Sequence, residues 1–147
     1  MGRWRGTRLF LTAAAFALTA GVARADGDVR GVSLVVEIKC DPLPGPGKVQ
    51  CLVGVRPGGG ALRWSDAIVL SAPPFALPLR TRVAVGDAKR NDTEGADLSL
   101  ALAATADGVG ELKVLARAVV CGEGGCRPVK AEGVARVAVG ASGSATR

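Results

Sequence analysis

Four cysteines are the residues of this chain with the most chemical potential: Cys40, Cys51, Cys121 and Cys126. The 147 residues contain no histidine and no tyrosine. The usual general base is therefore missing, together with the Ser–His and Cys–His pairs that activate nucleophiles. No phosphate-binding or cofactor-binding motif is present either. We expect no catalytic residues and no cofactor, and a protein that is not an enzyme unless its cysteines exchange disulfides.

The spacing of the cysteines separates a disulfide framework from a metal site. Cys40 and Cys51 are separated by ten residues, and Cys121 and Cys126 by four. Zinc sites bring their thiolates in close pairs, often with histidine, so the alternative of a zinc site fits this chain poorly. Four cysteines in an exported chain favour two disulfides, in one of three connectivities. The entropy of the closed loops does not choose among these connectivities.

The first 25 residues have the three-part pattern of a cleavable secretory signal peptide. Three arginines among the first eight residues precede an apolar run over 9–22, and Ala23-Arg24-Ala25 is a small-x-small cleavage site. The apolar run is too short for a membrane-spanning helix. We therefore expect a mature protein that begins at Asp26, lies in the periplasm or outside the cell, and has no stable membrane anchor.

The positive charge of the whole chain does not indicate an acidic partner, because part of it lies in the predicted signal peptide. It carries 19 basic against 13 acidic residues, but four of the basic residues lie in the predicted signal peptide, which leaves 15 against 13. After residue 25 the only aromatic residues are Trp64 and Phe75. Nucleic-acid binding needs a basic surface or several stacking rings, so we expect no nucleic-acid partner. A protein partner, of unknown kind, remains open.

Apolar residues at every second position predict strands along the rest of the chain. The expected strands cover 32–40, 49–55, 61–71, 79–85, 98–102, 112–120 and 127–139. Proline-rich and glycine-rich turns separate them, and a polar loop is expected over 89–95. The alanine and leucine content of 96–106 would also suit a helix, but its leucines alternate as in a strand. The sequence predicts an all-β, antiparallel, immunoglobulin-like β-sandwich of about seven strands over 26–141, with a flexible tail over 142–147.

This arrangement of strands favours local disulfides. Cys40 and Cys51 lie on the apolar stripes of two strands that flank one turn, so we predict a buried cross-strand bond between them. Cys121 and Cys126 bracket a glycine-rich hairpin tip, so we predict a second local bond that is open to solvent. The two large rings, Trp64 and Phe75, are expected in a core that otherwise consists of small side chains.

One stretch, Glu111 to Val139, reads ELKVLARAVVCGEGGCRPVKAEGVARVAV. It resembles the final hairpin of the immunoglobulin-like amino-terminal domain of DsbD-type periplasmic thiol–disulfide reductases, in which a strand ends in Cys and a short loop, a second Cys, a Pro and another strand follow. The loop here is one residue shorter than is usual in that family, and no aromatic residue follows Phe75. The resemblance implies the sandwich fold and, if the activity is shared, Cys121 and Cys126 as the exchanging pair.

Two functions follow from these observations. The leading hypothesis is an exported, disulfide-stabilised binding or structural module. The alternative is a periplasmic thiol–disulfide exchange protein that uses Cys121 and Cys126.

Overall fold

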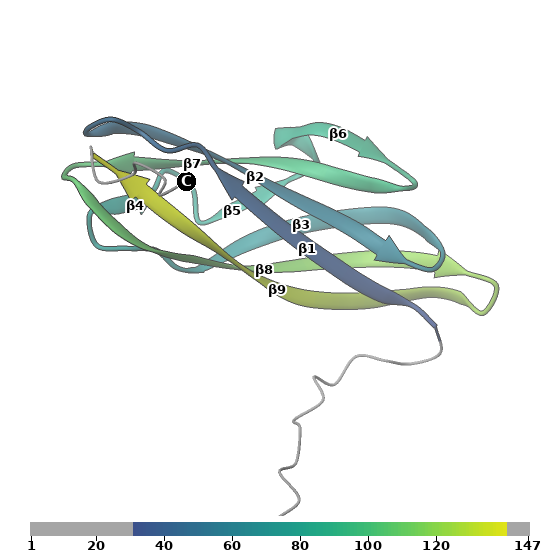
Figure 1. Ribbon diagram of the computed structural model, residues 1–147. Coiled ribbons are helices and arrows are strands. Elements are labelled where there is room, and N and C mark those ends of the chain that lie inside the picture. Colours follow the sequence, from purple (N-terminus) through teal and green to yellow (C-terminus); the bar gives the residue numbers. More distant parts are fainter. Residues whose placement is uncertain (1–30, 141–147) are drawn as a thin grey trace, which may run out of the picture.

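Nine strands and one short 3-10 helix make up the described part of the chain, residues 31–140, in the computed structural model (Figure 1). The predicted signal peptide over 1–25 and the predicted tail over 142–147 lie outside this range. The elements are β1 (Ser33–Cys40), β2 (Gly47–Gly58), β3 (Ala61–Ser71), β4 (Ala76–Pro78), β5 (Arg82–Ala84), η1 (Val85–Asp87), β6 (Ala88–Asp92), β7 (Gly95–Ala104), β8 (Gly108–Gly122) and β9 (Gly125–Val139).

The strands form two antiparallel sheets. The first sheet has the order β1-β2-β7-β4, with β6 also paired to β7, and the second has the order β5-β3-β8-β9. Four strands in the order β1-β2-β7-β6 facing β3-β8-β9 reproduce the A-B-E-D and C-F-G arrangement of immunoglobulin-like sandwiches. The predicted fold class, an all-β antiparallel sandwich, is confirmed.

The core between the sheets consists of small aliphatic side chains at alternate positions. β7 and β8 supply it most regularly, because every second side chain of each strand is buried. These side chains are Ala96, Leu98, Leu100, Leu102 and Ala104 in β7, and Leu112, Val114, Ala116, Ala118 and Val120 in β8. The alternating leucines of β7 therefore form a strand, and the helical alternative for this segment is wrong.

The segment between β3 and β7 differs from the expected single strand over 79–85. The Leu79 amide donates to the carbonyl of Ala101 in the first sheet, whereas the carbonyl of Thr81 accepts from Val69 in the second. Residues two positions apart thus bond to opposite sheets, and β5 pairs with β3. Leu79, expected on an inward face, is 58% exposed. Local alternation does not encode this change of sheet, because it depends on contacts between distant residues.

The polar loop expected over 89–95 is instead mostly β6 and the tight turn that follows it. Asp92 pairs with Gly95 and Asn91 with Ala96, so the chain returns to β7 directly. An edge strand with polar side chains on both faces shows no apolar alternation, which explains why the pattern did not predict it.

The two aromatic side chains are not equivalent. Phe75 is half-buried and packs against the core, whereas the prediction for Trp64 is wrong. A β-bulge between Leu62 and Trp64 shifts the register by one residue. Trp64 therefore lies opposite Val119 on the outer face of the second sheet, where it is partly exposed.

One side of the sandwich is closed where β1 passes over β9. Gly133 of β9 lies so close to β1 that an added Cβ would be 2.8 Å from Val36 Cγ1 and 3.0 Å from Ile38 Cδ1. Beyond β1, the Leu43 amide donates to the Ala138 carbonyl at 3.2 Å, which ties the following turn to the end of β9. The two sheets are thus joined along this side by close packing and backbone hydrogen bonding.

Candidate functional site

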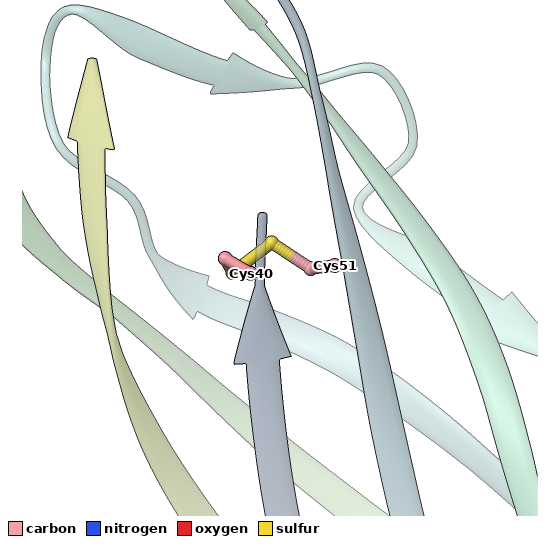
Figure 2. The surroundings of a disulfide bond; sticks show 2 residues. All are labelled: Cys40 and Cys51. Carbon is pink, nitrogen blue, oxygen red and sulfur yellow. A yellow bond between two sulfur atoms is a disulfide. The ribbon is translucent and has the colours of Figure 1, made fainter. Parts of the chain in front are cut away.

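The disulfide Cys40–Cys51 joins a half-buried cysteine, Cys40, to a buried one, Cys51, and packs against the core. The two residues are direct partners in the β1–β2 ladder, and their sulfurs are 2.02 Å apart (Figure 2). Cys51 is 3% exposed and lies between Val49 and Val53 on the inward face of β2. An attacking thiolate must reach a sulfur atom in order to exchange with it. This bond is therefore a structural link between the first two strands.

The disulfide Cys121–Cys126 lies at the tip of the β8–β9 hairpin. The two residues are again direct ladder partners, with sulfurs 1.98 Å apart. Val120 points into the core, so Cys121 faces the opposite side, and Cys126 is exposed. Both disulfides have the local pairing that the sequence predicted, and such bonds are typical of exported proteins.

The surroundings of the tip disulfide are open and contain few charges. An open surface depression of about 440 Å³ adjoins it, lined mainly by glycines of the hairpin tip and of the β2–β3 turn. Its charged residues are Arg127 and Glu123. A thiolate at this place would be stabilised by Arg127 and opposed by Glu123. The tip therefore offers access to an attacking thiol without a clear electrostatic preference for the thiolate.

The outer face of the second sheet carries a buried carboxylate between two arginines. The side chain of Asp66 in β3 is 0% exposed. The Nε–H of Arg117, its direct partner in β8, donates to Asp66 Oδ1 at 2.9 Å, and an η-nitrogen of Arg117 donates to Oδ2. Arg82 Nε donates to Oδ2 at 2.7 Å. Two guanidinium groups share one carboxylate, which leaves a net positive charge.

The two arginines determine the ionisation of Asp66. Burial by itself would raise the pKa of Asp66, but the hydrogen bonds and charges of Arg117 and Arg82 outweigh it and hold the pKa below its ordinary value. The hydrogen bond to Asp66 in turn raises the pKa of Arg117. Asp66 and Arg117 are therefore both charged at neutral pH.

Trp64 completes this group on the side of the tip disulfide. The guanidinium carbon of Arg117 lies 5.9 Å from the centroid of the Trp64 ring, within the range of a cation–π interaction. Trp64, Asp66, Arg82 and Arg117 together are called the Arg–Trp patch below. Lys130 lies directly opposite Arg117 on β9 and adds another positive charge at its margin.

Apolar side chains surround the Arg–Trp patch on the same face. Val119 and Pro128 lie in the row of Trp64, and Leu115 lies beside Ile68 in the row below. Val134 of β9 is 53% exposed. Aliphatic groups thus lie beside the patch, and Glu132 of β9, opposite Leu115, adds one exposed carboxylate to the same face.

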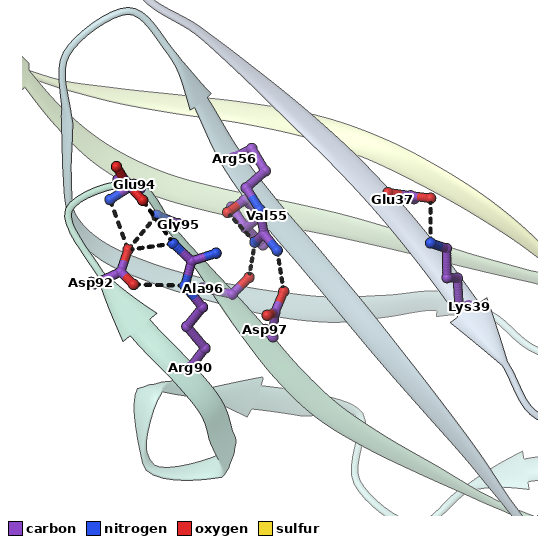
Figure 3. A network of polar contacts seen from close by, with 10 residues as sticks. All are labelled: Glu37, Lys39, Val55, Arg56, Arg90, Asp92, Glu94, Gly95, Ala96 and Asp97. Atoms are coloured by element: carbon purple, nitrogen blue, oxygen red, sulfur yellow. Dashed lines mark hydrogen bonds and ion pairs between the residues drawn. The ribbon is translucent and has the colours of Figure 1, made fainter.

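The outer face of the first sheet is different, because most of its charged side chains are held in ion pairs (Figure 3). Arg56 donates to Asp97 at 2.5 Å and to the Ala96 carbonyl at 2.8 Å. Arg90 pairs with Asp92 at 2.6 Å and with Glu94 at 3.1 Å. Lys48 of β2 is an exception, because it makes no ion pair within residues 31–140.

The sequence did not indicate the Arg–Trp patch. Asp66 and Arg117 occupy outward positions of their strands, where a solvated role is the usual interpretation. Their contact joins residues 51 positions apart and needs the β3–β8 register, including the bulge before Trp64. The only sequence feature that pointed to the patch was Asp66, a charged residue in the middle of the run Ala61–Ser71.

Within residues 31–140, no group of three or more potential ligands among His, Cys, Asp and Glu is placed to hold a metal ion. Across the same range, no helix has the length and apolar character needed to cross a membrane.

Comparisons with known proteins add little about function. No protein-family model matches the chain, and no curated protein matches it. Among solved structures, it is similar to AggA, the major subunit of aggregative adherence fimbriae type I from Escherichia coli. The two share 10% identity with a TM-score of 0.39, over 73% of this chain and 95% of AggA. A similarity this distant carries no conclusion about activity.

Proposed function

We propose that this protein is an exported, non-enzymatic binding module that recognises a protein partner through the outer face of its second sheet. The observation that carries the proposal is the buried Asp66 carboxylate, which holds Arg82 and Arg117 in place beside Trp64. Tryptophan and arginine are the residue types that contribute most to protein interfaces. Side chains already held in one conformation lose less entropy when a partner binds.

The charge of this face favours a partner that bears carboxylates. Arg117 directs its Nε–H and one η-nitrogen to Asp66, so other donors of its guanidinium are available to a ligand. Arg82 contacts Asp66 through Nε, and Lys130 lies beside Arg117. An acidic protein surface would complement these groups, with aliphatic contacts around them.

The experiment is affinity purification from the host's cell envelope with two charge-reversal variants. Lys130→Glu changes an exposed residue next to the Arg–Trp patch without touching Asp66. Lys89→Glu makes the same change on exposed β6 of the first sheet and serves as the matched control. We expect a partner that is retained by the wild type and the control and lost with Lys130→Glu. Equal recovery with all three proteins, at equal thermal stability, would contradict the proposal.

A second function, thiol–disulfide exchange at Cys121 and Cys126, is favoured by one specific observation. Their bond lies at an exposed hairpin tip beside an open depression, whereas the Cys40–Cys51 bond packs against the core through buried Cys51. The likeness of this hairpin to that of DsbD-type reductases belongs to this second proposal. The reduction potential of the tip disulfide distinguishes the two functions.

A further inference from the structure

The open edge of the first sheet is interrupted at Ser99. On this edge, β4 pairs with β7 between Ala104 and Leu102. Leu79, the residue after β4, extends this pairing by donating its amide to the Ala101 carbonyl at 2.9 Å. β6 pairs with β7 only between Gly95 and Leu98. The intervening chain leaves to form β5 in the second sheet. Within the described residues, no strand therefore pairs with β7 at Ser99 on this edge.

An open surface depression of about 370 Å³ lies at this interruption. β2 and β7 form one wall, with Lys48, Gln50 and Ser99 among the lining residues. The detour of the chain forms the other wall, through Leu79, Arg80 and Val83. We call this depression the Ser99 notch. Its size is at the lower end of the range for small-ligand sites.

The polar wall of the Ser99 notch has one uncompensated positive charge. Arg80 donates to Asp87 at 2.7 Å, and the other oxygen of Asp87 accepts the Ala84 amide at 3.2 Å, so this pair is internally satisfied. Lys48 makes no ion pair with any group of residues 31–140. The Gln50 amide and the Ser99 hydroxyl lie on the same wall and supply hydrogen-bond donors. These groups suit a single carboxylate.

The wall formed by the detour of the chain also has apolar side chains, Leu79 and Val83. Val83 is 3% exposed and belongs to the core, so the notch reaches the edge of the interior. Leu79 at its rim is 58% exposed. Leu77 and Val85, on either side along the chain, are 59% and 40% exposed. Of these exposed aliphatic side chains, Leu79 lines the notch, where it lies beside buried Val83.

We propose that the Ser99 notch binds a carboxylate attached to a short branched aliphatic group. Lys48, Gln50 and Ser99 would hold the carboxylate, and Leu79 and Val83 would contact the aliphatic group. The same chemistry occurs in a free branched-chain carboxylic acid and at the carboxyl terminus of a peptide that ends in leucine or valine. The site is separate from the Arg–Trp patch, which lies on the other sheet.

The test is a titration followed by the backbone amide signals in two-dimensional NMR. The probes are 4-methylpentanoate, N-acetyl-Gly-Leu with a free carboxylate, the same dipeptide as its carboxamide, and acetate. We expect saturable shifts of the Leu79, Ser99 and Ala101 amides with either or both of the first two probes. The carboxamide should bind at least about tenfold more weakly, because it lacks the charge-assisted bonds. Saturation by 4-methylpentanoate or by the dipeptide acid identifies the source of the ligand.

Two variants make this test specific to the notch. Lys48→Gln removes the uncompensated charge at an exposed residue and should weaken binding about tenfold. Lys89→Gln removes an exposed charge on β6 and should leave binding unchanged. Equal binding of the dipeptide acid and its carboxamide, equal binding of acetate, or the absence of saturation at millimolar concentrations would each overturn the proposal.

Discussion

Asp66 shows how a charged side chain can be buried on the outward face of a strand. Its carboxylate is covered by the two arginines that neutralise it, rather than by the core. A buried carboxylate of this kind stabilises the fold less than its geometry suggests, because desolvation offsets the attraction. Its removal is nevertheless costly, since two guanidinium groups are left without their shared partner.

We predict that Asp66→Asn lowers the free energy of unfolding by about 2 kcal/mol, below the full cost of breaking a buried pair because both arginines are partly exposed. Urea denaturation measures this change. Glu37→Gln removes a carboxylate whose partner Lys39 is equally exposed, and it should cost less than about 0.5 kcal/mol. Equal losses for the two variants would show that Asp66 behaves as an ordinary surface residue.

The lowered pKa of Asp66 predicts an acid-dependent loss of stability. The folded protein keeps Asp66 ionised below its ordinary pKa of 3.8, whereas the unfolded chain takes up a proton near that value. The stabilisation is therefore complete above this pH and disappears as pH falls toward the lower pKa of the folded state. The difference in unfolding free energy between wild type and Asp66→Asn should shrink over this range. A difference that stays constant between neutral and acid pH would contradict the assignment.

The two disulfides should differ in their response to a reductant. We predict that Cys121–Cys126 is reduced before Cys40–Cys51, because Cys126 is exposed at the hairpin tip whereas Cys51 is buried and Cys40 is half-buried. Mass spectrometry after alkylation of the freed thiols follows the order. For a binding module, the tip bond should also resist a glutathione buffer. A midpoint potential above about −250 mV would favour thiol–disulfide exchange instead.

At the scale of elements, the contact between β1 and β9 depends on a glycine. A side chain at Gly133 would meet Val36 and Ile38, whose β-branched side chains have few alternative rotamers. We predict that Gly133→Val lowers the free energy of unfolding by about 2 kcal/mol through overpacking. Gly124 at the hairpin tip has no atom within 4 Å of an added Cβ, so Gly124→Ala is the control in the same denaturation experiment. Similar stability of the two variants would mean that β1 can move away from β9.

The accuracy of sequence-based prediction also differed between elements. Strands that bury one face, such as β7 and β8, were predicted correctly, because burial of every second side chain requires apolar residues at alternate positions of the sequence. The edge segment from β4 to β6 was predicted poorly, because its course depends on bonds to two different sheets. The Arg–Trp patch and the Ser99 notch both depend on such non-local pairing. Only the cysteine pairs, which are close in the chain, were predictable as candidate site residues.

For the whole molecule, the proposed export implies that the amino-terminal signal peptide is removed. Two disulfides stabilise a sandwich with a core of small side chains, and they persist in an oxidising compartment. The pattern of arginines, apolar run and Ala23-Arg24-Ala25 predicts that the leader is removed during export. Cleavage would also remove four of the 19 basic residues, so the exported protein would be nearly neutral overall. The positive charge at the Arg–Trp patch would then be a local feature of a nearly neutral protein.

We predict that protein recovered from the envelope or medium of the host begins at Asp26. Intact-mass analysis measures this, and the same measurement shows whether both disulfides have formed, since each bond removes two hydrogen atoms. A variant with Ala23→Arg and Ala25→Arg should keep its leader, because signal cleavage needs small residues at these positions. Recovery of exported wild-type protein that still carries Met1 would contradict cleavage, and recovery from the cytoplasm alone with four free thiols would contradict export itself.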